Sequence, residues 1–212
     1  ARTMRLDVRN NLYVLLRRLP RRMVLPYTID WMRRYAWIAE SKNASGPFIH
    51  GLLDGVLRSI IRPKRQAVSA EAFEQFAKLD ATVERLRTVL SNTPARRVML
   101  VDVGKNIYAY WRACRELNLE VVAVADNHLA ARGRKYRGVP VVTDDVARGK
   151  RYDIAIIANL SPAHARTRSD HWRLTQSRPV IDLFSPEMNE RFAVTCERPA
   201  ASKSLRIAAR TA

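Results

Sequence analysis

The sequence has little cysteine and no long uncharged run. Its two cysteines, Cys114 and Cys196, do not make a disulfide framework. Cys114 falls on the apolar face of an expected helix, which predicts a buried and reduced thiol. A membrane-spanning helix needs roughly 20 apolar residues, and uncharged runs such as residues 23–29 are far shorter. We therefore expect no segment to cross a membrane.

Acidic residues are also scarce. The chain has 20 Asp and Glu against 38 Lys and Arg, which gives a formal charge of +18 and a pI near 10.9. Such a field favours an anionic partner, either nucleic acid or acidic lipid, although a solvated, arginine-rich surface has the same composition. The chain begins Ala1-Arg2-Thr3-Met4, with neither an initiator methionine nor a signal-peptide pattern. We expect it to be part of a longer protein.

Residues 95–186 are expected to form an α/β domain. Residues 98–103 have the composition of a strand buried on both faces, residues 107–117 carry bulky residues at helical spacing, and residues 120–125 restart a buried strand. This order is the opening of a dinucleotide-type βαβ unit. Further strands are expected at residues 138–142, 152–158 and 179–184, with a helix from Ser161-Pro162. The alternation predicts a parallel, doubly wound, Rossmann-like sheet.

The glycine loop of that βαβ unit is mostly missing. The fingerprint Gly-x-Gly-x-x-Gly needs glycines for the tight turn, for the approach of the pyrophosphate and for helix packing. The corresponding residues are Asp102, Gly104 and Ile107, so only the middle glycine is present. A carboxylate at position 102 repels a pyrophosphate, and Ile107 blocks close approach of the helix. These residues weaken the prediction of a nucleotide site but leave the predicted fold unchanged.

Four residues are candidate ligands for a nucleotide or nucleotide-sugar, with NAD less favoured: Gly104, Lys105, Asp126 and Asn159. Lys105 is placed to attract a phosphate, although a solvated lysine fits equally. Asp126 ends the second strand, where an acid binds a ribose hydroxyl, or it caps a turn with Asn127. Asn159 follows the central strand, beside the crevice where open α/β sheets bind ligands. These residues do not identify the ligand.

No catalytic or metal-binding set is expected. His164 and His171 with Asp170 do not form a convincing metal set, because seven residues on a helix bring only two ligands to one face. The closely paired acids Asp144-Asp145 are expected in a loop. Ser161 is predicted to be a helix N-cap.

Residues 1–68 are strongly basic. They contain fourteen Lys and Arg against four Asp and Glu, a net charge of +10, and their Arg pairs alternate with apolar and aromatic blocks. This is typical of helices that lie in a bilayer interface. The alternatives are packing on a neighbouring domain and binding of nucleic acid. Nucleic acid is not expected as a partner, because no basic groove with spaced stacking residues is evident.

Three short helices are expected in this basic segment. Pro20 and Pro26 divide the first from the second, and a polar turn over residues 41–47 precedes the third. Their expected bounds are residues 8–19, 29–40 and 48–61.

Residues 69–94 are predicted to be a linker helix, which runs from an N-cap at Ser69 to Leu90 with one apolar stripe. It either docks on the α/β domain or coils with a second chain. Residues 187–212 lose all periodicity, and the end of the chain resembles a frayed tail.

The basic segment resembles part of a known family. Arg9-Asn10-Asn11-Leu12-Tyr13-Val14-Leu15-Leu16-Arg17-Arg18-Leu19-Pro20 is similar to the stretch after the catalytic domain of many bacterial family 2 glycosyltransferases, and residues 51–58 with the cluster at 62–65 look like its later part. The similarity covers about residues 5–75. It implies an upstream catalytic domain with an Asp-x-Asp element. Because no such element is present, no catalytic residue is carried over.

The α/β domain carries a second resemblance. Residues 121–126, then Gly138-Val139-Pro140-Val141 and residues 153–158, look like the small Rossmann-like domains of sugar acetyltransferases and sugar dehydrogenases. Such domains also follow glycosyltransferase tails. Together the resemblances imply a non-catalytic C-terminal portion of an enzyme of cell-surface polysaccharide synthesis, peripheral at the cytoplasmic face of the inner membrane. The alternative is a nucleotide- or sugar-nucleotide-binding module of oxidoreductase type.

Overall fold

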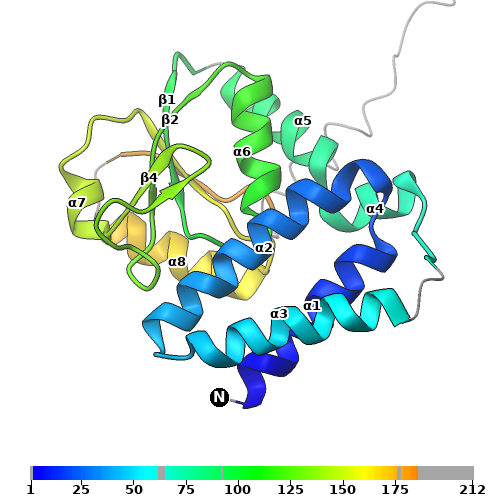
Figure 1. Cartoon of the computed structure of the whole chain (residues 1–212). Helices are drawn as coiled ribbons and strands as arrows, with labels where there is room; N and C mark the ends of the chain where they lie inside the picture. Colours follow the sequence, from blue (N-terminus) through cyan, green and yellow to red (C-terminus); the bar gives the residue numbers. More distant parts are fainter. Residues whose placement is uncertain (1, 62–64, 92, 176–177, 186–212) are drawn as a thin grey trace, which may run out of the picture.

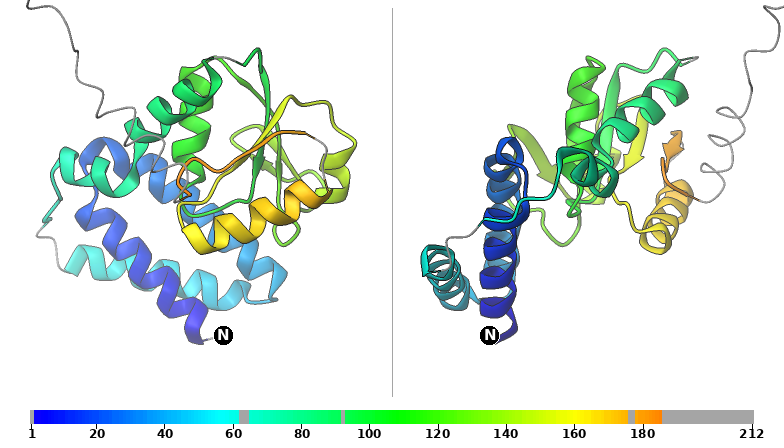
Figure 2. Two further views of the ribbon diagram at one scale, coloured as in Figure 1. Left: turned by 180° about the vertical axis from the view of Figure 1, so that it is seen from behind. Right: turned by 90° about the vertical axis from the view of Figure 1, so that its right-hand side faces the viewer.

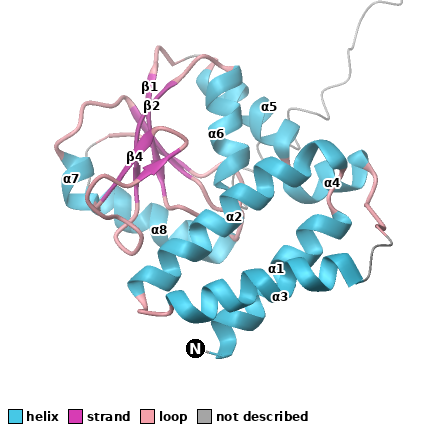
Figure 3. Ribbon diagram, in the orientation of Figure 1, coloured by secondary structure: helices cyan, strands magenta, loops and turns pink. Residues whose placement is uncertain are grey.

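The computed structural model describes residues 2–61, 65–91, 93–175 and 178–185 (Figure 1). The chain begins with helices, and strands then alternate with further helices. Figure 3 shows the strands gathered together with helices around them. The helices before the sheet are α1 (Arg2–Arg18), α2 (Arg21–Ser41), α3 (Ser45–Ile61), α4 (Ala70–Ala77) and α5 (Leu79–Leu90). The predicted tail over residues 187–212, Cys196 and most of the basic cluster at 62–65 lie outside the described residues.

The basic segment forms three helices that are longer than expected. Pro26 lies inside α2, so the prediction that it separates two helices was wrong. A proline there removes one backbone donor near the start of a helix of 21 residues, a loss that the packing of α2 outweighs. Gly46 and Pro47 lie in the first turn of α3 instead of in a turn before it. Proline is tolerated there because the first helical N–H groups have no partner within the helix.

Helix α3 packs closely on α1 through two glycines. A Cβ atom added at Gly51 would lie 2.7 Å from the carbonyl oxygen of Arg5, and one at Gly55 would lie 3.2 Å from that of Arg9. The Arg5–Asp54 ion pair, with Nε and Oδ2 2.6 Å apart, joins the same two helices. The two helices therefore approach backbone to backbone, and the opposite face of α3 is left uncovered.

The predicted linker helix is broken at Lys78. Ser69 is its N-cap, as expected, and accepts a hydrogen bond of 3.1 Å from the backbone N–H of Ala72. Lys78 has a left-handed backbone with φ of 53°, and its N–H bonds to the carbonyl of Glu74. The single helix was therefore a wrong prediction. The break turns α5 onto α6, so the second half of the stripe docks within the chain, with Leu79 and Leu86 buried, whereas 80% of Phe76 is exposed.

The α/β part is a six-stranded sheet with the order β3-β4-β2-β1-β5-β6, parallel except for β3 against β4. This confirms an α/β fold with a mostly parallel sheet. The strands are β1 (Arg97–Val101), β2 (Glu120–Ala125), β3 (Lys135–Tyr136), β4 (Val139–Val142), β5 (Ile154–Ile157) and β6 (Val180–Ile181). The accompanying helices are α6 (Ile107–Glu116), α7 (Asp144–Arg148) and α8 (Pro162–Thr175).

Two of these short elements were missed. Strand β3 spans two residues and helix α7 five, which is too short for a hydrophobic period to be read. The expectation that Asp144-Asp145 lie in a loop was wrong, because they open α7. Thr143 is its N-cap and accepts a hydrogen bond of 3.4 Å from the N–H of Val146.

Helices cover both faces of the sheet, and two cores result. On one face, the ends of α1 and α2 pack with α4, α5 and α6 around residues such as Leu15, Tyr27 and Tyr110. On the other face, α7 and α8 cover the sheet, with Trp172 fully buried. Cys114 belongs to the first core and is buried, as expected, and burial raises the pKa of its thiol to about 12.

The layers are visible from the side (Figure 2). Helices α1 and α2 lie between α3 and the α/β part, so α3 is the outermost helix. The joint between the helices and the α/β part is aromatic: the ring of Tyr27 packs edge-on against Phe73 and Tyr108, each at 5.2 Å between centroids. Among the described residues, no helix combines the length and apolar character needed to cross a bilayer.

Candidate functional site

Polar residues follow the parallel strands at one edge of the sheet. Asp102 comes directly after β1, Asp126 after β2 and Asp182 after β6, while Asp144 and Asn159 stand two residues beyond β4 and β5. The carboxyl ends of parallel strands share one edge, which is where open α/β sheets bind ligands. The edge was correctly located by the sequence, and its contacts decide what each residue does.

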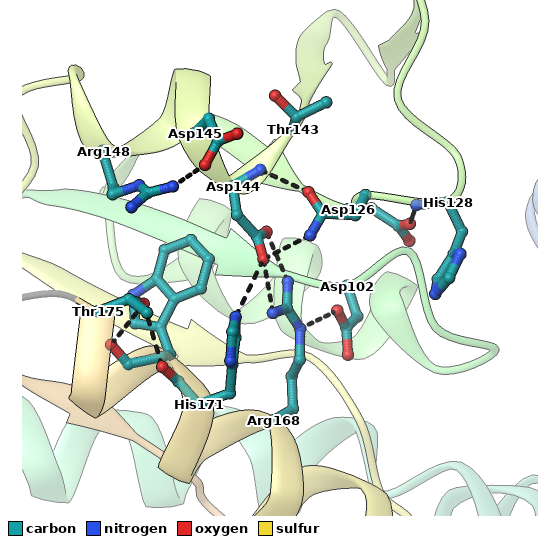
Figure 4. A network of polar contacts seen from close by, with 12 residues as sticks. Asp102, Asp126, His128, Thr143, Asp144, Asp145, Arg148, Arg168, His171 and Thr175 are labelled. Carbon is teal, nitrogen blue, oxygen red and sulfur yellow. Dashed lines mark hydrogen bonds and ion pairs between the residues drawn. The ribbon is translucent and has the colours of Figure 1, made fainter.

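Arg168 of α8 ties two of these acids together (Figure 4). Its Nε lies 2.7 Å from Asp102, and its two terminal nitrogens lie 2.7 and 2.6 Å from the carboxylate of Asp144. Burial lowers the pKa of Arg168, but the hydrogen bonds and charges of Asp144 and Asp102 outweigh it and raise that pKa above its usual range. Asp102 is therefore already paired with a cation of the same chain.

Two histidines flank Arg168 on the same face of α8. The Nε2 atom of His164 lies 3.1 Å from Asp102, and that of His171 lies 3.9 Å from Asp144. More than half of each imidazole side chain is exposed, whereas 14% of the Arg168 side chain is. Within the part of the chain that the structure describes, no group of three or more His, Cys, Asp or Glu is placed to hold a metal ion.

Asp126 is used as a backbone cap. One carboxylate oxygen accepts a hydrogen bond of 2.9 Å from the N–H of Val103, and the other accepts bonds of 2.9 Å from the N–H groups of His128 and Leu129. The residue is 7% exposed. Of the two roles predicted for Asp126, the structure shows the cap of the turn that follows β2. The same carboxylate also accepts a hydrogen bond from the loop after β1.

Gly104 and Lys105 lie under helix α2. A Cβ atom at Gly104 would lie 2.8 Å from the carbonyl oxygen of Ala158, so glycine is required here for contact with the end of β5. The Nε of Arg34 donates a hydrogen bond of 3.0 Å to the carbonyl of Val103, and the Lys105 ammonium lies 5.6 Å from the ring of Trp31. The space left between α2 and this loop is about 10 Å³. A nucleotide at these residues would require α2 to move.

Asn159 shapes the turn before α8. Its side-chain oxygen accepts a hydrogen bond of 2.9 Å from the N–H of Ser161, which makes an Asx-turn, and its carbonyl accepts a bond of 3.3 Å from the hydroxyl of Tyr110. The four predicted ligand residues therefore line one edge of the sheet, and each has structural contacts there. Their predicted role in holding a nucleotide stays a prediction.

A basic groove was missed by the sequence reasoning. It is a cleft of about 460 Å³ between α2 and the loop before and along β3, lined by Arg33, Trp37, Glu40, Ala131, Arg132, Gly133, Arg134, Lys135, Arg137 and Gly138. Five of these residues are cations and one is an acid. The signal was available in the run Arg132-Gly133-Arg134-Lys135-Tyr136-Arg137, which has four basic residues among six.

Helix α3 carries an exposed apolar face. Its residues recur every three or four positions, and between 46% and 68% of each residue is exposed: Ile49, Leu53, Val56, Leu57, Ile60 and Ile61. This face lies opposite the glycines that contact α1. Exposed apolar residues gathered on one helix face mark an interaction surface more often than single exposed residues do.

Comparison with protein-family models, with curated proteins and with solved structures found no match for this chain.

Proposed function

We propose that this chain is a non-catalytic C-terminal portion of a bacterial family 2 glycosyltransferase, and that it holds its parent enzyme on the anionic cytoplasmic face of the inner membrane. The observation that carries the membrane part is the exposed apolar face of α3. The sequence resemblance of about residues 5–75 carries the parent identity. An upstream catalytic domain is the expected covalent partner.

The α3 face has the pattern of an interfacial helix. Leu53 and Ile60 stand in the middle of an apolar stripe along its outer side, and more than 60% of each is exposed. An interfacial helix buries such a stripe at the boundary between headgroups and acyl chains and keeps its polar side outside. Burying one such side chain stabilises binding by about 1.5–3 kcal/mol. Several of them together are enough to hold a chain on a surface.

The charge around α3 favours an acidic bilayer over a protein partner. Residues 1–68 carry a net charge of +10, and arginines of α1 lie beside α3. Each Lys or Arg near an anionic membrane surface adds about 1 kcal/mol. Arg58 of α3 and Arg17 of α1 both lie 5.0 Å from the ring of Tyr13, so cations and an aromatic ring gather where α3 meets α1.

We also infer that the α/β part is a degenerate Rossmann-like domain. Support comes from the strand order: the parallel strands run β4-β2-β1-β5-β6, which in chain order is the 3-2-1-4-5 arrangement of doubly wound nucleotide-binding sheets. Its degeneracy is supported by the loop after β1, where α2 covers Gly104 and Asp102 is held by Arg168. We propose that such a domain serves in regulation or in docking.

Vesicle co-sedimentation of the full chain tests the membrane proposal. We expect binding to vesicles of phosphatidylcholine with phosphatidylglycerol and much weaker binding to phosphatidylcholine alone, with a loss as salt is raised. Leu53→Glu places a charge in the middle of the α3 stripe and should weaken binding by at least about tenfold, which is the effect of losing 1.4 kcal/mol. Since Leu53 is exposed, the variant should fold.

Leu174→Glu is the matched control, because Leu174 is an exposed leucine on α8, and 87% of it is exposed. It should leave vesicle binding unchanged. Equal binding of Leu53→Glu and the parent chain would refute the membrane role. A Leu53→Glu variant that instead turns a dimer into a monomer in light scattering would assign the stripe to a second copy. The residues encoded upstream of Ala1 test the parent identity, which requires an α/β domain with Asp-x-Asp.

A further inference from the structure

We propose that the basic groove between α2 and the loop at residues 131–138 binds the phosphate groups of a small, soluble diphosphate. The groove shares Arg33 and Trp37 with the narrow space at Gly104 and Lys105, but none of the four predicted nucleotide ligands lines it. It also lies on the side of α2 that faces the α/β part, whereas α3 lies on the far side of the α1 and α2 layer (Figure 2). The proposal does not depend on membrane binding.

The groove has more positive charge than Glu40 and the nearby Asp30 neutralise. Arg134 pairs with Glu40, with Nη2 and Oε2 2.6 Å apart, and Arg137 pairs with Asp30 at 3.0 Å. For the other three cations of the lining, Arg33, Arg132 and Lys135, no ion pair is found among the described residues. Arg33 stands on the α2 wall and the other two on the loop wall. An anion between the walls would therefore meet cations from both sides.

Both walls of the groove are held in place before any ligand binds. The loop wall starts at the turn that Asp126 caps, and it is closed by hydrogen bonds from Arg134 N to the carbonyl of Ala131 at 3.0 Å and from Val141 N to that of Arg134 at 2.9 Å. The α2 wall is joined to it by the buried Arg134 side chain, whose guanidinium lies 5.0 Å from the ring of Trp37. Pre-formed sites lose less conformational entropy on binding.

The volume and lining of the groove select the ligand class. A cleft of about 460 Å³ falls within the range of small-molecule sites, roughly 300–1,000 Å³. Its walls are mostly polar and basic, which disfavours an apolar ligand. Arginine binds phosphate oxygens through two parallel N–H groups, so two arginines and a lysine suit adjacent phosphates better than one carboxylate. Trp37 offers the only large aromatic ring among the lining residues.

Titration calorimetry of the full chain with inorganic pyrophosphate tests the proposal. The titration is done in about 0.15 M salt, which screens scattered surface charges. We expect saturable binding with a stoichiometry near one, and weaker binding of inorganic phosphate. Arg132→Gln and Lys135→Gln should each weaken pyrophosphate binding roughly tenfold, as expected for loss of one charge-assisted contact. Both side chains are exposed, so both variants should keep the parent melting temperature.

Arg151→Gln is the matched control, since Arg151 is an exposed arginine ahead of β5, at the opposite edge of the sheet. Arg151→Gln removes one positive charge, as Arg132→Gln does, and should leave pyrophosphate binding unchanged. Absence of saturable heat with pyrophosphate overturns the proposal, as does equal weakening by Arg132→Gln and Arg151→Gln. A third arm uses phosphatidylglycerol vesicles. If Arg132→Gln weakens vesicle binding while pyrophosphate gives no heat, the groove contacts lipid headgroups, and the soluble ligand is rejected.

Discussion

The hydroxyl of Tyr136 donates a hydrogen bond of 2.6 Å to the carboxylate of Asp30, which is 106 residues earlier in the chain. The bond joins β3 of the α/β part to α2 of the basic segment, and both residues are buried. Arg137 adds an ion pair to the same carboxylate at 3.0 Å. Burial raises the pKa of Asp30 despite these partners, while the charge of Asp30 offsets burial and raises the pKa of Arg137. One acid therefore fixes α2 against the sheet.

Replacing Asp30 with alanine should destabilise the protein by about 3 kcal/mol. The substitution leaves the Arg137 cation and the Tyr136 hydroxyl without their acceptor at a buried interface, and breaking a buried pair costs about 3–5 kcal/mol. Tyr136→Phe removes only one hydrogen bond and should cost about 1 kcal/mol. Urea unfolding followed by circular dichroism measures both. A loss below about 0.5 kcal/mol for Asp30→Ala would show that α2 is held by apolar packing alone.

Replacing Arg168 with alanine should also destabilise the protein by about 3 kcal/mol, because Asp102 and Asp144 would then face each other without a shared cation. Arg168→Lys should recover part of the loss, since an ammonium cannot make the paired contact with Asp144. Arg166 is exposed on the same helix, and Arg166→Ala should change the free energy of unfolding by less than about 0.5 kcal/mol. Similar losses for the two alanine variants would contradict the bridging role of Arg168.

Much of the fold could be predicted from local patterns. The strand at residues 120–125 was predicted with its observed bounds, and β1, β4, β5 and α6 lie within two residues of the expected bounds at each end. Such elements are buried on a regular period, which a sequence displays directly. The break at Lys78 has no local signal, because lysine does not favour a left-handed backbone. The left-handed backbone at Lys78 lets α5 pack on α6, which is a tertiary contact that no local pattern contains.

The site was harder to predict than the fold. Asp126 and Asn159 were correctly predicted to follow strands at the carboxyl edge, since parallel strands place their ends together. The partners at this edge come from distant segments: Arg168 lies 66 residues from Asp102, and Arg34, which covers the loop at Val103, lies 69 residues before it. Residue spacing in the sequence does not predict contacts between segments this far apart. The same limit explains the basic groove, whose second wall belongs to α2.

Cys114 should be unreactive in the folded protein. Burial raises the pKa of its thiol from 9.0 to about 12, so the thiolate that reacts with iodoacetamide is nearly absent at pH 8. Because the pKa of the folded state is the higher one, this group stabilises the fold fully below pH 9, and the contribution is lost as the pH rises through about 12. Labelling in a Cys196→Ser background should therefore be slow at pH 8 and fast in urea. Rapid labelling of the folded chain would contradict this burial.

Gly51 and Gly46 should respond in opposite ways to replacement by alanine. At Gly51 the new Cβ would lie 2.7 Å from the carbonyl oxygen of Arg5 and 2.9 Å from the Cβ of Val8, so α3 must shift away from α1. Overpacking of this kind costs about 1–3 kcal/mol. At Gly46, in the first turn of the same helix, nothing lies within 4 Å of an added Cβ. Alanine favours the helix there by up to about 1 kcal/mol.

Urea unfolding of both variants compares packing with helix propensity inside one helix. Equal stabilisation by both would mean that α3 does not rest on α1 through Gly51, and the exposed apolar face of α3 would then lose the support that orients it outward.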